Sequence, residues 1–337
     1  MGSRFDIVTV CFSGDLALLK LQARSLRLFF HPDSIGRIIV VENDPSPQEF
    51  IVRFETEILP QYGELAKRVV CLPRAKLLPN TFGATGWRVQ QVLKLLVVDE
   101  LEQDACLILD AKNHFLRPVG WSTFADGAGR FASHLRKHTG SMAAYLGHSL
   151  NYFGVASADA MRAAMPASTP YVLDVPVVRY LLKYVETRER CEFAEFFLKR
   201  TRHVTEFFMY FGFMLRFGVA PETLYYFEAP RSISLFTRAP ERPDAVLRAL
   251  RSLRGERIVA LGLHRNRLPQ LQDRERRLLN GLWKERGVML TQEDFVTFWS
   301  AATKNADDED QLNANPSRSN HMGYQLARNP LLQEQRS

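Results

Sequence analysis

The sequence predicts an α/β fold in which helices flank a mostly parallel, Rossmann-related central sheet. Residues 106–109 form a short apolar run, typical of a buried parallel strand, and the polar Asp110 follows it directly. Residues 38–41, which follow Arg37, form a second apolar run that ends at the polar Glu42. Residues 5–41 read as strand, helix and strand, which implies a parallel pair joined by a right-handed crossover.

The first elements follow in order along the chain. Asp15 can cap a helix with apolar spacing, and Pro32 lies just beyond its end. Pro118 prevents the polar turn after the central strand from continuing as regular structure. Strands are predicted over residues 5–12, 37–41, 69–72 and 106–109, and helices over 16–29 and 87–99.

The second half is more helical. The predictions are a loop over 121–137, a turn or short strand over 149–154, a strand over 258–263, and helices over 155–165, from 169–176 through Val185, and over 191–202, 205–215, 278–286 and 292–302. Without internal repeats or an interior low-complexity linker, residues 1–303 are predicted to form a single domain. Residues 304–337 are rich in Asp, Ser, Asn and Gln and are predicted to be a disordered tail.

Composition and charge exclude several classes of protein. No apolar run reaches the roughly 18 residues that cross a bilayer, and a signal-peptide pattern is lacking. The four cysteines have no metal-binding spacing, so they are expected to be reduced in a cytoplasmic protein. No GxGxxG follows the first strand, which argues against a Rossmann dinucleotide site, and GxxxxGK[ST], GxSxG and HExxH are also missing. The formal net charge of +7 permits an anionic partner.

The predicted helix over 87–99 has two different faces. Val89, Val92, Leu93, Leu96 and Val97 share the apolar face, and Trp87, Gln90, Gln91 and Lys94 share the other. The second face offers amides, one cation and a Trp but no acid, which suits a polar anionic ligand better than solvent. The alternative is a surface helix with a coincidental composition.

Two later polar positions are candidate site residues. Glu206 begins a strongly apolar helix, where it is either a first-turn carboxylate favoured by the helix dipole or an acid whose pKa is raised by aromatic surroundings. His264 and Arg265 follow the apolar strand over 258–263 and form a third polar strand end. A lone His is otherwise usually structural or solvated.

These residues together carry a resemblance to a known family. The segments are Val40-Val41-Glu42-Asn43-Asp44, Gly86-Trp87-Arg88-Val89-Gln90-Gln91-Val92-Leu93-Lys94-Leu95, Leu107-Ile108-Leu109-Asp110-Ala111-Lys112-Asn113 with Phe115 and Pro118, Thr205-Glu206-Phe207 with Tyr210 and Gly212, and Leu263-His264-Arg265. Across residues 5–290 the chain resembles a bacterial GT-A glycosyltransferase, closest to a little-characterised group whose central motif reads D-A-K-N or D-S-D-N. The resemblance implies a GT-A-like fold, with a helical acceptor-side region over about 157–215, and sugar transfer from a nucleotide-sugar donor.

The resemblance also implies roles for individual residues. Asp110 matches the first acid of the D-x-D turn and would act at the reaction centre. Glu206 would be the general base for an acceptor hydroxyl if the reaction inverts, or would orient a sugar if it retains. The residues expected to bind the nucleotide-sugar are Thr9, Cys11, Glu42, Asn43, Arg88, Gln91, Lys94, Lys112 and Asn113.

The motif departs from D-x-D at its third position, where Lys112 replaces the second acid. Two interpretations remain open. Asp110, together with Asn113 and His264, holds Mg²⁺ or Mn²⁺ through oxygen and imidazole ligands. Alternatively, Lys112 itself neutralises the diphosphate and a divalent cation is dispensable.

The implied partners are a nucleotide-sugar donor and a glycan or glycolipid acceptor, for which a bacterial envelope polysaccharide is one candidate. The positive charge is compatible with peripheral contact to an anionic membrane. Nucleic acid is not expected, because the basic residues are dispersed without an aromatic-interleaved stripe. One rival is a sugar nucleotidyltransferase, which needs a Gly-rich basic loop that Ser13-Gly14-Asp15 matches poorly. The other is a basic nucleotide- or nucleic-acid-binding module without turnover.

Overall fold

The structure is a computed structural model that describes residues 4–201 and 203–301. Its strands form three sheets. They are β1 (Phe5–Cys11), β2 (Ile35–Glu42), β3 (Val69–Pro73), β4 (Ala105–Asp110), β5 (Asn113–Phe115), β6 (Phe131–Ser133), β7 (Tyr171–Asp174), β8 (Tyr225–Phe227), β9 (Ser232–Leu235) and β10 (Ala260–Leu263). The central sheet has the order β3-β2-β1-β4-β7, in which β7 runs antiparallel to β4 and the other neighbours are parallel. The smaller sheets are β5-β10-β9 and β6-β8.

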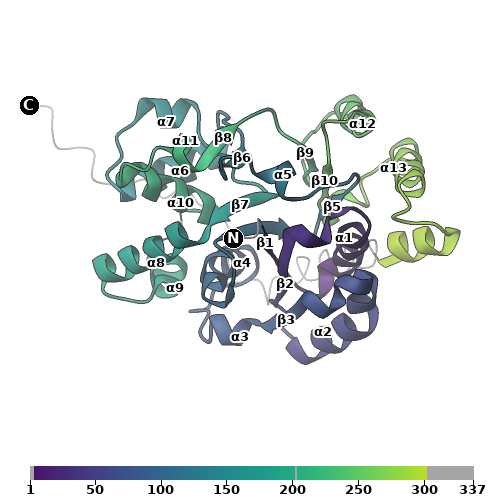
Figure 1. The fold of residues 1–337 in the computed structure, drawn as a ribbon, viewed down its shortest axis with the longest axis horizontal. Helices are drawn as coiled ribbons and strands as arrows, with labels where there is room; N and C mark the ends of the chain where they lie inside the picture. The colour runs from purple at the N-terminus through teal and green to yellow at the C-terminus, as the bar shows by residue number, and fades with distance from the viewer. Residues whose placement is uncertain (1–3, 202, 302–337) are drawn as a thin grey trace, which may run out of the picture.

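Helices surround the central sheet. They are α1 (Leu16–Phe29), α2 (Pro47–Arg53), α3 (Arg74–Leu77), α4 (Gly86–Leu96), α5 (Trp121–Phe124), α6 (Gly140–Tyr152), α7 (Ala158–Arg162), α8 (Val175–Glu189), α9 (Phe193–Glu195), α10 (Glu206–Arg216), α11 (Pro221–Leu224), α12 (Pro243–Ser252) and α13 (Asp273–Glu285), with a further helix over 292–301. In Figure 1, α6–α11 gather on the left of the central sheet and α1, α2, α12 and α13 lie on the right. In the described part of the chain, each helix is too short or too polar to cross a membrane.

The predicted fold class is confirmed, because the central sheet is mostly parallel and helices flank it. Helix α1 has the predicted bounds, and β1, β2, β3, β4 and β10 lie where apolar runs predict strands. Strands β1, β4 and β10 are buried along nearly their whole length, so their sequences are largely apolar and easy to recognise, whereas β3 at the sheet edge is mostly half-buried. The predicted tail over 304–337 lies outside the described residues.

The prediction of a helix from residue 169 onward is wrong in its first part. Tyr171–Asp174 forms strand β7, which pairs with β4, and the helix begins only at Val175. A short apolar run does not distinguish a strand from a buried helix by periodicity. The Asp174 carboxylate accepts a hydrogen bond from the Val177 backbone N–H at 2.9 Å and so caps α8.

The region before β7 also differs from the prediction. Helix α6 occupies residues 140–152, where a turn or short strand is predicted over 149–154, and the helix predicted over 155–165 is reduced to α7. Gly and Ser lower the helix propensity of α6, so tertiary packing against α10 stabilises it. Gly212 permits that contact, because a Cβ there would lie 2.8 Å from the Phe153 ring.

The order of the central sheet creates a switch point between β1 and β4. The chain leaves β1 toward β2 on one side, and β4 lies on the other side. In open α/β sheets, ligands bind beyond the carboxyl ends of the strands at such a point. Asp110 pairs in register with Val10, so the end of β4 lies beside the end of β1.

Candidate active site

A cavity of about 630 Å³ opens at the switch point. Its walls come from the carboxyl ends of β1, β2 and β4, the first turns of α4 and α10, and the residues after β10. Ligand pockets of drug-sized molecules commonly measure about 300–1,000 Å³, so the cavity is large enough for a nucleotide-sugar. The charged and ionisable residues that line it are Asp15, Arg74, Lys94, Asp110, Lys112, Glu206, His264 and Arg265.

The floor of the cavity is built around the Asp110 carboxylate. Its Oδ1 lies 2.7 Å from the Lys94 Nζ, and its Oδ2 forms a short ion pair with the Lys112 Nζ. The Thr169 hydroxyl also donates to Oδ2, at 2.8 Å. Burial opposes ionisation of Asp110, but the ammonium groups of Lys112 and Lys94 outweigh it and hold the pKa of this carboxyl well below its usual range. Asp110 is therefore a fixed negative charge between two cations.

The turn that carries Asp110 is held by amide side chains. The Asp110 N–H donates to the Asn113 Oδ1 at 2.8 Å, and the Asn113 Nδ2 donates to the Thr169 carbonyl at 3.3 Å. From α1, the Gln22 Nε2 donates to the carbonyls of Asp110 and Asn113 at 2.8 and 3.1 Å. The Thr9 hydroxyl in turn donates to the Gln22 Oε1 at 2.9 Å. Since every partner is part of the folded core, the carboxylate is preorganised before any ligand arrives.

Glu206 approaches the same floor from the start of α10. The Thr205 hydroxyl accepts the Phe208 N–H and caps this helix, which directs Glu206 into the cavity. Its Oε1 lies 3.3 Å from the Lys94 Nζ, so one ammonium group links Glu206 to Asp110. Burial raises the pKa of Glu206, and the Lys94 cation offsets only part of the rise. A carboxyl group with a raised pKa in a cleft has the properties of a general acid or base.

Two arginines line the cavity nearer the strand ends. Arg74 follows β3, and its Nη1 donates to the Asn43 Oδ1 at 3.3 Å. Arg265 follows β10, forms an ion pair with Asp15 at 3.3 Å and lies over the Phe12 ring at 4.6 Å. Together with Lys112, Arg74 and Arg265 place three cations on the walls of the cavity. These positive charges favour an anionic ligand.

The structure brings together seven of the predicted site residues and leaves five outside the cavity walls. Cys11, Asn43, Lys94, Asp110, Lys112, Glu206 and His264 line the cavity. Those outside are Thr9, Glu42, Arg88, Gln91 and Asn113. Thr9 and Asn113 support the floor through hydrogen bonds, and the Glu42 carboxylate accepts the N–H groups of Asp44 and Arg74 and so shapes the turn that carries Asn43.

Gln91 occupies a different position from the one predicted. Its side chain is fully buried, and neither of its amide atoms has a hydrogen-bond partner among the described residues. Gln90, one position earlier, lines the cavity and donates to the Val10 carbonyl at 3.3 Å.

Sequence reasoning missed Arg74 on the cavity wall and two residues that hold the Asp110 turn from behind it. Arg74 directly follows a predicted strand, so the rule that found Asp110 and Glu42 could have found it. Gln22 and Thr169 lie in segments predicted as helix, and only tertiary contacts bring them to Asp110.

Arg88 has a structural position rather than a place in the cavity. Its guanidinium donates to the carbonyls of Val204 and Thr201, both at 2.8 Å, and through a short contact to that of Phe197. It also lies over the Phe197 ring at 4.2 Å. Burial lowers the pKa of Arg88 to about 10. These contacts tie α4 to the segment that leads into Glu206.

Replacing Arg88 with methionine is expected to lower the free energy of unfolding by about 3 kcal/mol, because three carbonyl groups lose a charged donor. Urea unfolding measures this change as a lower midpoint with an unchanged slope. Arg190→Met, at a position outside these contacts, serves as the control. A loss below about 0.5 kcal/mol, the usual range for surface changes, would contradict the anchoring role.

The donor atoms expected to hold a divalent cation already have partners within the protein. Both Asp110 oxygens are bonded to ammonium groups, and Oδ2 also accepts the Thr169 hydroxyl. The Asn266 N–H donates to the His264 Nδ1 at 3.2 Å, and the Thr237 Oγ1 lies 3.1 Å from the same nitrogen, so Nδ1 is already engaged within the protein. Within residues 4–201 and 203–301, no group of three or more His, Cys, Asp or Glu side chains is arranged to hold a metal.

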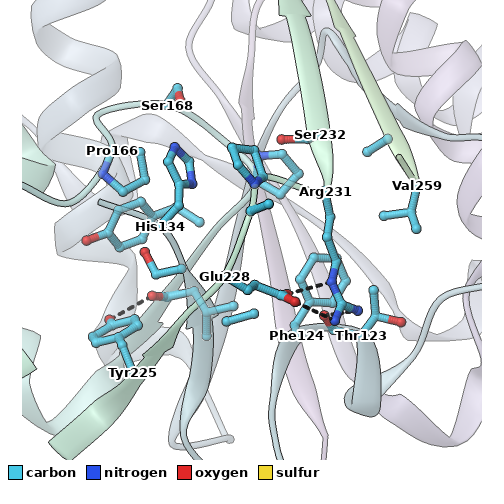
Figure 2. Close-up of a pocket in the computed structure, with 18 residues that line it drawn as sticks. Thr123, Phe124, His134, Pro166, Ser168, Tyr225, Glu228, Arg231, Ser232 and Val259 are labelled. Atoms are coloured by element: carbon cyan, nitrogen blue, oxygen red, sulfur yellow. Dashed lines mark hydrogen bonds and ion pairs between the residues drawn. The ribbon is translucent and has the colours of Figure 1, made fainter. Parts of the chain in front are cut away.

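A second, much smaller cavity of about 60 Å³ lies on the other side of the segment that carries Ser168. Figure 2 shows His134, Ser168 and Tyr225 around it, with Glu228 and Arg231 paired by the dashed contacts. Its volume corresponds to about two water molecules, so a nucleotide-sugar cannot enter it. The cavity at the switch point, where Asp110 and Glu206 meet at Lys94, is the candidate site.

One family model matches most of the chain. It is described as a family of unknown function (DUF6492) and matches residues 8–229, which include the central sheet, the Asp110 turn and Glu206 but not His264 or Arg265. None of the curated proteins matches the sequence.

The chain is also similar to solved structures of low sequence identity. The galactosyltransferase LgtC, solved with donor and acceptor sugar analogues, is 12% identical over 84% of this chain and 100% of its own, with a TM-score of 0.43. The glycosyltransferase GlyE of Streptococcus pneumoniae TIGR4 is 11% identical over 91% of this chain and 64% of its own, with a TM-score of 0.42. Mouse xyloside xylosyltransferase 1 is 11% identical over 77% of this chain and 97% of its own, with a TM-score of 0.37. Because these TM-scores are below 0.5, we base the function on the geometry of the cavity.

Proposed function

The chain belongs to the family of unknown function DUF6492, and from the geometry of its cavity we propose that it is a GT-A-like glycosyltransferase. It would move a sugar from a nucleotide-sugar donor to a hydroxyl group of an acceptor. The resemblance of its motifs to bacterial GT-A enzymes supports this assignment.

One observation carries the proposal. At the switch point of the sheet, the acid of the D-A-K-N turn and the acid that begins α10 meet at a single buried ammonium group, Lys94. Lys94 and Glu206 are each 4% exposed and the Asp110 side chain is 15% exposed, so three ionisable groups lie mostly buried at the floor of the cavity. Burying ionisable groups is costly for stability, and a cluster of such groups in a cleft is a candidate for a chemical role.

The cations of the cavity would stabilise the leaving group. When the bond between the sugar C1 and the diphosphate oxygen breaks, negative charge develops on the nucleoside diphosphate. Lys112, Arg74 and Arg265 line the walls where this charge can be met by fixed positive groups. Asn43 and the backbone of Cys11, at the ends of β2 and β1, would contact the nucleoside.

Glu206 would act on the acceptor side. In an inverting reaction it takes the proton of the acceptor hydroxyl while that oxygen forms the new bond to C1. In a retaining reaction it orients a sugar instead. The cation of Lys94 holds Glu206 in place and keeps its pKa from rising further.

The transfer would proceed without a divalent cation. Lys112 occupies the position of the second acid in D-x-D and is bonded to Asp110, so its ammonium group replaces the metal as the positive charge beside the diphosphate. The acceptor would be a glycan or glycolipid, as the motif resemblance implies. The protein would act in the cytoplasm, where its positive charge is compatible with peripheral contact to an anionic membrane.

Nucleotide binding is expected to raise the melting temperature of the purified protein. UDP, GDP, CDP and CMP and their sugars are screened with Mn²⁺ and with EDTA. A ligand at about 100 times its Kd stabilises the native state by about 2.7 kcal/mol, which corresponds to roughly 5 °C. One base is expected to give this shift equally in Mn²⁺ and EDTA, and Asp110→Ala is expected to abolish it.

Glu57→Gln, on the surface at the Arg53 pair, is the control and should keep the shift. A shift that needs Mn²⁺ would overturn the metal-free interpretation but not sugar transfer. If no nucleotide raises the melting temperature of the protein, and duplex DNA binds to it in a strongly salt-dependent manner, the basic binding module is the better description.

A further inference from the structure

An exposed tryptophan stands at the rim of the cavity. Trp87 is 48% exposed and lines the cavity from the first turn of α4. Its ring centroid lies 5.9 Å from that of Tyr145 on α6, and Met142, also on α6, lines the adjoining wall. A large aromatic ring that is half open to a polar cavity has an apolar face available for a ligand.

Helix α4 connects this rim to the reaction centre. Trp87, Gln90 and Lys94 line the cavity and are spaced three and four residues apart, so they lie on one face of the helix. Lys94 lies seven positions after Trp87, a separation of about 10 Å at the helical rise. Lys94 contacts Glu206, so along α4 the aromatic rim lies about 10 Å from the residue that contacts the acid expected to receive the acceptor proton, a length comparable to two linked sugar rings.

Trp87 faces the helical half of the molecule rather than the strand ends. Its ring neighbour Tyr145 belongs to α6, which packs against α10, the helix of Glu206. The polar groups suited to the nucleoside, Asn43 and Arg74, lie at the ends of β2 and β3. The rim is therefore on the acceptor side of the cavity.

From these positions we propose that Trp87, supported by Tyr145, forms a subsite for the second sugar residue of the acceptor. The apolar C–H face of a pyranose ring packs on the indole ring, while the first residue presents its hydroxyl to Glu206. This inference rests on the proposed sugar transfer, and it assigns an acceptor of at least two linked sugars.

The test measures saccharide binding directly. Saturation-transfer NMR gives dissociation constants for glucose, galactose, mannose and N-acetylglucosamine and for disaccharides of each, in the presence of the nucleoside diphosphate that gives the largest thermal shift, or without nucleotide if none does. At least one disaccharide is expected to bind about fivefold or more tightly than its monosaccharide. Trp87→Ala is expected to remove that gain, and Trp87→Phe to keep part of it.

Tyr180→Ala is the matched control, because Tyr180 on α8 is 68% exposed and lies outside the cavity walls. It should leave every dissociation constant unchanged. The subsite is overturned if no saccharide binds, if Trp87→Ala leaves the disaccharide gain intact, or if that variant loses the nucleotide shift instead, which would place a base on Trp87. If no nucleotide shifts the wild type but disaccharides still bind through Trp87, the proposed donor chemistry fails and the subsite stands.

Discussion

Replacing Glu206 with glutamine is expected to lower the rate of sugar transfer by about 10²–10⁴-fold, the usual contribution of a general base. The amide keeps the shape of the side chain but cannot take a proton. Nucleotide binding should be retained, because the Asp110 floor and the cavity cations are unchanged. The measurement is turnover of the donor identified by thermal shift, in the presence of a saccharide acceptor.

The pH profile separates a base from a residue that only orients the substrate. Burial raises the pKa of Glu206 above its usual range, so the acid limb of kcat/KM should lie above the ordinary Glu value of about 4.3. Activity falls as pH decreases through this pKa, because protonated Glu206 cannot act as a base. Removing the Lys94 cation by Lys94→Met raises the pKa further, so the limb should move to higher pH.

Glu57→Gln provides the comparison for both measurements, since the exposed Glu57 carboxylate pairs with Arg53 at the surface. Full activity in Glu206→Gln would rule out both roles of Glu206. Glu206→Gln could instead reduce the rate while Lys94→Met leaves the acid limb of the pH profile in place. In that case Glu206 orients a sugar, and the reaction is a retaining one.

Replacing Lys112 with aspartate is expected to make the proposed sugar transfer depend on a divalent cation. The wild type should be equally active in Mn²⁺ and in EDTA. In Lys112→Asp the diphosphate loses its ammonium partner, and activity in EDTA should fall by about 10²–10³-fold, as when one charge-stabilising donor is removed. The variant places a second carboxylate two residues after Asp110, and oxygen ligands of this kind bind Mn²⁺. Added Mn²⁺ should therefore restore part of the lost activity.

Lys112→Met is the matched control for this experiment. It removes the same cation without supplying a ligand, so Mn²⁺ should not rescue it. Inactivation of the wild type by EDTA would show that Lys112 does not replace the metal. If both variants lose the same activity and Mn²⁺ does not rescue Lys112→Asp, the turn cannot be converted into a metal site by this substitution.

Much of the fold could be predicted because its central strands are buried on both faces. Continuous apolar runs identify β1, β2 and β4, and the polar residues that end them identify the edge where ligands bind. The short strand β7 and the Gly- and Ser-rich helix α6 escaped prediction. Their local sequences favour no single state, and pairing with β4 and packing on α10 stabilise them.

The sequence by itself determined the class of the sheet and the chemistry of its edge, because the period of apolar residues and the polar strand ends are local properties of the chain. It placed Asp110, Lys112, Asn43 and Glu206 among the candidate site residues. Only the tertiary structure could show that Lys94 joins Asp110 to Glu206. Lys94 and Glu206 are separated by 112 positions, and no local pattern encodes a contact between them. Distant contacts also explain why the binding role predicted for Arg88 differs from its position in the structure. An arginine suits an anionic ligand, but the guanidinium of Arg88 donates to carbonyl groups more than 100 positions away, which give it a structural role.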